Sequence, residues 1–87
     1  MSVCRTLGDI IYHILHNGRT DLESSQFHIE KVINRNFIQP DHFYYNFLLY
    51  VFGVIYGGYL YVDKKSVFVR LYDAKFKKLE CEHEFTR

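Results

Sequence analysis

Residues 42–56 read HFYYNFLLYVFGVIY, a run whose large apolar side chains would point in every direction of a helix or a strand. Its length is ordinary for a helix and long for a strand. Phe, Tyr, Val and Ile nevertheless favour strands, so the assignment stays open between the two. We predict a buried helix over 41–56, which ends before Gly57 and Gly58.

Both segments before this run have apolar residues at helical spacing. The first stripe predicts a helix over 6–16 and consists of Leu7, Ile10, Ile11, Ile14 and Leu15. Gly18 ends that helix, because glycine tolerates the left-handed conformation that follows a helix C-terminus. A shorter stripe of Ile29, Val32 and Ile33 predicts a second helix over 21–35.

After Gly58 the hydrophobic period changes from helical to two residues. This alternation predicts antiparallel strands over 59–63, 66–72 and 77–85. Helices followed by strands indicate an α+β fold in which the N-terminal helices pack on a small C-terminal antiparallel sheet. The same order would suit a winged-helix-like protein. The 87 residues form a single domain.

The overall charge is nearly balanced at +1. This value excludes both a strongly acidic mimic of nucleic acid and a uniformly basic nucleic-acid coat protein. The two cysteines, Cys4 and Cys81, could form one disulfide but do not make a disulfide framework, and the first residues lack the pattern of a signal peptide. The expected setting is therefore the cytoplasm, with free thiols.

Candidates for chemistry are few. His13, His16, Cys81 and His83 would make a zinc set if the last strand lay beside the first helix, but a packing role for the histidines is favoured. Cys81 alternates with carboxylates that would raise the pKa of its thiol, so it is a poor nucleophile. We predict no enzyme, no catalytic residues, no cofactor and no metal.

Basic residues concentrate between positions 64 and 78, where Asp73 is the one acidic residue. The group is Lys64, Lys65, Arg70, Lys75, Lys77 and Lys78. A basic hairpin with aromatic neighbours is typical of a phosphate-contacting wing. A solvated sheet edge, on which lysine discourages pairing between edges, is the favoured reading. Nucleic-acid binding is therefore an alternative function.

Aromatic residues are in surplus, with eight Phe and eight Tyr. Tyrosine is common at protein interfaces, because it buries area and keeps a polar tip. We predict a non-enzymatic regulator or inhibitor that binds another protein, or itself as a homodimer. The predicted contact residues are Tyr44, Tyr45, Tyr50, Tyr59 and Tyr61. Short chains of this kind are often viral or phage accessory proteins.

A membrane span is the last alternative, because residues 43–62 contain no charged side chain and are long enough to cross a bilayer. Against it, six tyrosines are spread through the run instead of gathering at its ends. A membrane partner is therefore not expected.

Overall fold

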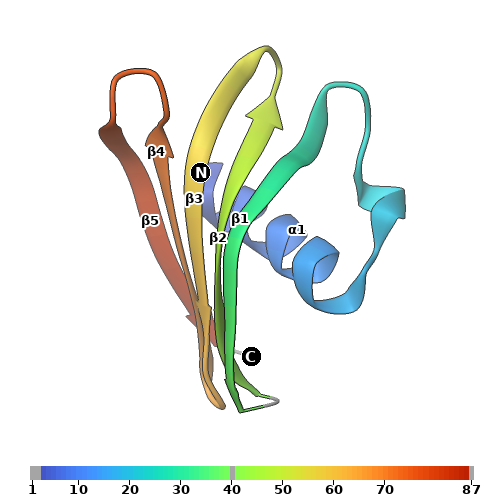
Figure 1. Cartoon of the computed structure of the whole chain (residues 1–87), viewed down its shortest axis with the longest axis vertical. Coiled ribbons are helices and arrows are strands. Elements are labelled where there is room, and N and C mark those ends of the chain that lie inside the picture. The colour runs from blue at the N-terminus through green and yellow to red at the C-terminus, as the bar shows by residue number, and fades with distance from the viewer. Residues whose placement is uncertain (1–2, 40, 87) are drawn as a thin grey trace.

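The computed structural model describes residues 3–39 and 41–86, which form one helix, one short helical turn and one antiparallel sheet (Figure 1). The elements in chain order are α1 (Val3–Asn17), the 3-10 turn η1 (Thr20–Leu22), β1 (Phe27–Gln39), β2 (His42–Val51), β3 (Val54–Val62), β4 (Ser66–Asp73) and β5 (Lys78–Thr86). The strands pair in the order β1-β2-β3-β4-β5. Every sheet neighbour is therefore also a chain neighbour.

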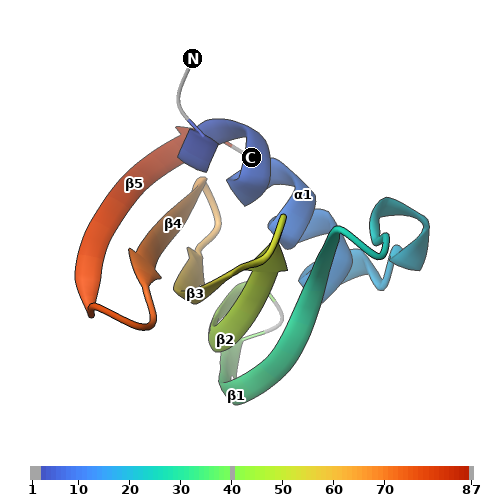
Figure 2. The ribbon, with the colours of Figure 1, turned by 90° about the horizontal axis from the view of Figure 1, so that it is seen from above.

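Helix α1 packs against one face of this sheet, and the sheet curves around it (Figure 2). The helix lies close to β4 at Gly8, where an added Cβ would come within 2.5 Å of the Val69 Cγ1 atom. Gly18 ends the helix with a left-handed φ of 66°, and its N–H donates to the Ile14 carbonyl. Nine side chains between the two layers are fully buried: Ile11, Phe43, Phe47, Leu49, Leu60, Val62, Val67, Val69 and Leu71.

The helix predicted over 41–56 is wrong, because these residues form β2 and the start of β3. Along β2 the buried positions alternate with half-buried ones, and Phe43, Phe47 and Leu49 point into the core. Such alternation is the strand period of two. The run looked apolar in every direction because the half-buried positions of the other face also carry large side chains. The strand preference of Phe, Tyr and Val decides the outcome.

The helix predicted over 21–35 is also wrong, and the cause is bulging of β1. Ile29 faces Leu49 and Val32 faces Phe47, but the register shifts between them. A bulge residue therefore lets two positions three apart share one sheet face. In the sequence this spacing imitates a helix. Just before β1, Ser24 closes a turn, since its Oγ accepts hydrogen bonds from the N–H groups of Gln26 and Phe27.

The remaining predicted elements are present. Residues 6–16 lie within α1. The strands predicted over 66–72 and 77–85 correspond to β4 and β5, and the strand predicted over 59–63 corresponds to the second half of β3, which begins at Val54. With one helix in place of three, the fold is mostly sheet, and both the helix-rich α+β arrangement and the winged-helix order are wrong. Among the residues that the structure describes, none of the helices has the length and apolarity to cross a bilayer.

Candidate functional site: the open face of the sheet

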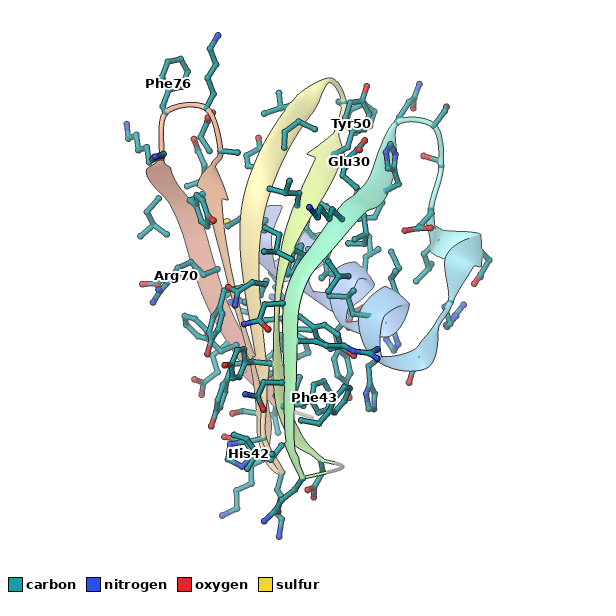
Figure 3. All side chains as sticks on the ribbon, viewed as in Figure 1. Glu30, His42, Phe43, Tyr50, Arg70 and Phe76 are labelled. Atoms are coloured by element: carbon teal, nitrogen blue, oxygen red, sulfur yellow. The ribbon has the colours of Figure 1, made fainter. Side chains whose placement is uncertain are left out.

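The sheet face turned away from α1 is covered by no other element of the described chain, and we call it the open face. Figure 3 shows Phe43 on the helix side of the sheet and Arg70 on the opposite side. Strand alternation places Tyr44 next to Phe43 in the chain but on the open face. The cross-strand register then aligns Tyr44 with Tyr61 of β3, and Tyr61 with Phe68 of β4.

Four rings on β2, β3 and β4 form the aromatic cluster, which consists of Tyr44, Tyr59, Tyr61 and Phe68. Tyr59 is central: its ring centroid lies 5.9 Å from that of Tyr44 and 6.4 Å from those of Tyr61 and Phe68. Partial burial and the neighbouring hydroxyls of Tyr61 and Tyr44 raise the pKa of Tyr59 above its ordinary value. The cluster is thus a continuous, half-buried aromatic surface with uncharged hydroxyls.

Polar groups border the aromatic cluster. His42 Nε2 and the Tyr61 hydroxyl lie 2.5 Å apart in a hydrogen bond. The Arg70 guanidinium carbon lies 5.4 Å from the centroid of the Phe68 ring, while its Nε donates to a Glu82 carboxylate oxygen at 3.2 Å. This border fixes the orientation of the outer rings and leaves the cluster close to neutral.

Of the five predicted contact tyrosines, the structure brings Tyr44, Tyr59 and Tyr61 together. Tyr50 lies on the same face six residues beyond Tyr44, where its ring stacks on His28 at 4.9 Å. Tyr45 belongs to the other face: it is 5% exposed, and its hydroxyl donates to the Leu15 carbonyl at the end of α1. Tyr45 therefore anchors the helix.

The predicted basic group does not form one patch. Lys64 and Lys65 lie in the turn between β3 and β4, whereas Lys75, Lys77 and Lys78 lie at the other end of β4. An eight-residue strand separates these two turns by about 25 Å. Arg70 lies between them on the open face and is paired with Glu82. The lysines thus offer two separate small patches of charge.

The histidines of the predicted zinc set make contacts within the fold. His16 stacks between Tyr12 and Phe43, and His83 stacks on Phe85. His13 is hydrogen-bonded to Asn17. No group of three or more His, Cys, Asp or Glu able to hold a metal occurs in the described part of the chain.

The prediction of a free thiol is wrong for Cys81, which is disulfide-bonded. The side chain of Cys4 lies outside those that the structure describes. The cellular compartment stays a prediction.

Sequence reasoning missed Phe68, Arg70 as a ring-stacking residue, and His42. The available signal was the alternation of β4, in which Phe68, Arg70 and Tyr72 occupy every second position. Once residues 43–62 are read as two strands, Phe68 falls opposite Tyr61 and Arg70 falls opposite Tyr59, while Tyr72 falls opposite Gly57.

Comparison of the chain with protein-family models, with curated proteins and with solved structures finds no match. The functional argument therefore depends on the site itself.

Proposed function

We propose that this chain is a non-enzymatic binding protein whose open face docks on another protein. The observation that carries this proposal is the aromatic cluster, a contiguous set of rings on a sheet face that no element of the described chain covers. Rings with hydroxyl tips bury a large area at low entropic cost and contribute strongly at the centre of interfaces. Arg70 and His42 supply the polar border that such a centre needs.

A protein partner suits this face better than a nucleic acid does. A stacking platform for single strands combines aromatic rings with a positive groove that follows the phosphates. Here Glu84 is aligned with Phe68, and Glu82 neutralises Arg70. The lysines lie in turns at the two ends of β4 and not beside the rings. The cluster therefore lacks a phosphate-binding border.

The same geometry indicates how the chain would act. A sheet face with rigid rings binds by covering a complementary apolar surface, and no bond is made or broken. Such binding blocks or stabilises the partner stoichiometrically, which is the action of a regulator or inhibitor. A homodimer that packs two open faces together would be a special case, since sheets stack face to face at about 10 Å.

Site-specific photo-crosslinking tests this proposal in cells of the source organism. A benzophenone amino acid replaces Tyr59 in one variant and Lys64, in an exposed turn, in a matched control. We expect one defined protein adduct from position 59 and none from position 64. The mass of the adduct distinguishes a second copy from a different protein. Equal adduct patterns from the two positions, or adducts to nucleic acid, would contradict the proposal.

A further inference from the structure

Two phenylalanines project into solvent at the same end of the sheet. Phe52 is in the turn between β2 and β3 and is 74% exposed, and Phe76 is in the turn between β4 and β5 and is 72% exposed. Both turns lie at one end of the molecule (Figure 1), and Figure 3 shows Phe76 at its tip. The turns are adjacent, because the Ala74 N–H donates to the Ile55 carbonyl at 3.3 Å. We call this end of the molecule the tip.

The fold does not require a phenylalanine at position 52. Phe52 has a left-handed φ of 47° and is followed by Gly53 with a φ of 88°. Two-residue hairpin turns of this kind favour Asn or Asp before Gly, and a bulky residue at positive φ is strained. The chain therefore holds a large apolar ring in an unfavourable conformation and exposes it to water. Strain together with exposure points to a role outside folding.

The charge beside Phe76 is positive. Lys75, Lys77 and Lys78 are all exposed in or beside the second turn, and the Lys75 ammonium lies 5.4 Å from the centroid of the Phe76 ring. The acidic residue of this turn, Asp73, points its Oδ1 at the N–H groups of Lys75 and Phe76, at 2.8 and 3.0 Å. The Asp73 carboxylate thus accepts hydrogen bonds from the turn backbone, and the charged groups on the outer surface of this turn are the lysines.

Further apolar surface connects the two turns. Val54 is 40% exposed and Ile55 is 37% exposed, between Phe52 on one side and Phe76 on the other. The tip is therefore a protruding surface with apolar side chains at its points and lysines beside them. Rings that enter the lipid headgroup region and lysines that pair with lipid phosphates are the two components of peripheral membrane binding.

We propose that the tip docks on an anionic lipid surface, with Phe52 and Phe76 inserted among the headgroups and the three lysines on phosphates. The rings protrude from two different turns, so they suit a fluid lipid interface better than one preformed protein pocket. In this pose the turns meet the membrane and the strands rise from it. The aromatic cluster then stays in water, where it can reach a protein partner. This membrane contact was not expected from the sequence.

Vesicle sedimentation tests the proposal with the full chain. The probes are vesicles of phosphatidylcholine with phosphatidylserine and vesicles of phosphatidylcholine alone. We expect binding to the anionic vesicles that weakens with added salt. Loss of one ring should lower the partition coefficient about tenfold, and loss of one lysine about fivefold.

The decisive variant is Phe52→Asn, because asparagine suits the left-handed position. We expect an unchanged or higher thermal midpoint together with about tenfold weaker lipid binding. Ile38→Ser is the matched control, since Ile38 is 55% exposed at the end of β1, away from the tip.

Failure of the wild-type chain to sediment with anionic vesicles would overturn the proposal. So would equal losses in Phe52→Asn and Ile38→Ser, or a protein adduct from a photo-crosslinker at position 52. None of these experiments probes the aromatic cluster, so a negative result would contradict the lipid-binding proposal without contradicting the proposed function.

Discussion

Replacing Gly58 by Ala should destabilise the fold much more than the same change at Gly57, although the two residues are adjacent in β3. Gly58 points to the helix-covered face, where an added Cβ would lie 2.2 Å from the Cε2 and Cζ atoms of the Phe47 ring. Gly57 points to the open face, where the Cβ would lie 2.1 Å from the Tyr72 Cζ atom. The two clashes are similar in distance and differ in whether the ring can move.

The magnitudes follow from that difference. Phe47 is fully buried, so its ring has no space into which it can turn, and overpacking of this kind costs about 1–3 kcal/mol. Replacing a glycine also restricts the unfolded chain, which offsets about 0.4–1 kcal/mol. The net cost of Gly58→Ala is then about 1–2 kcal/mol. Tyr72 is half-buried on an uncovered face and can rotate outward, so Gly57→Ala should stay within about 0.5 kcal/mol of wild type.

Urea denaturation of both variants measures these free energies at constant m value. The thermal midpoint of Gly58→Ala should fall by roughly 5–10 °C for a chain of this size. Adding Phe47→Leu to Gly58→Ala should cost less than the sum of the two single changes, because the clash is removed. Equal losses in the two glycine variants, or additive effects in the double variant, would refute the assignment of the covered and open faces.

Three further predictions concern single side chains. Tyr45→Ser should cost about 3–5 kcal/mol by removing a buried ring, whereas Tyr45→Phe should cost about 1 kcal/mol through the lost hydrogen bond, both measured by urea denaturation. Because the pKa of Tyr59 is raised in the folded state, stability should fall as the pH rises above about 10. Tyr59→Phe should show a smaller fall in thermal midpoint over that range. Hydrogen bonds from the N–H groups of Lys65 and Ser66 lower the pKa of Asp63 in the folded state. The charged Asp63 carboxylate therefore stabilises the fold above its ordinary pKa of 3.8, and this stabilisation is lost as the pH falls below that value. Asp63→Asn should remove this part of the acid sensitivity, and a carboxyl titration followed by NMR that shows an ordinary pKa for Asp63 would count against it.

The sequence was sufficient for α1, for β4 and β5, and for the second half of β3, since each of these has one clear hydrophobic period. It was insufficient for β1, where bulges place Ile29 and Val32 on one face at a helical spacing. Such an irregularity depends on the neighbouring strand, so no local pattern reveals it. The prediction for residues 42–56 was wrong for another reason. Large side chains occupy both faces of β2, so the strand period of two cannot be seen in the hydrophobic pattern.

The candidate site was predictable in composition and not in arrangement. Tyr44, Tyr59 and Tyr61 were identified as surplus aromatic residues, but their common face follows from the pairing of β2 with β3. A helix over this segment gives no reason to place Tyr44 and Tyr45 on opposite faces. The strand assignment separates them at once, because adjacent residues of a strand point to opposite faces.

Hydroxyl-radical footprinting tests the proposed binding face most directly. The chain is oxidised once in purified form and once in an extract of the source cells from which membranes have been removed. If the open face engages a protein, Tyr59 and Tyr61 are protected in the extract while Phe52, at the tip, stays as reactive as in the purified chain. Equal oxidation of Tyr59 and Tyr61 in the two preparations would contradict the proposed function.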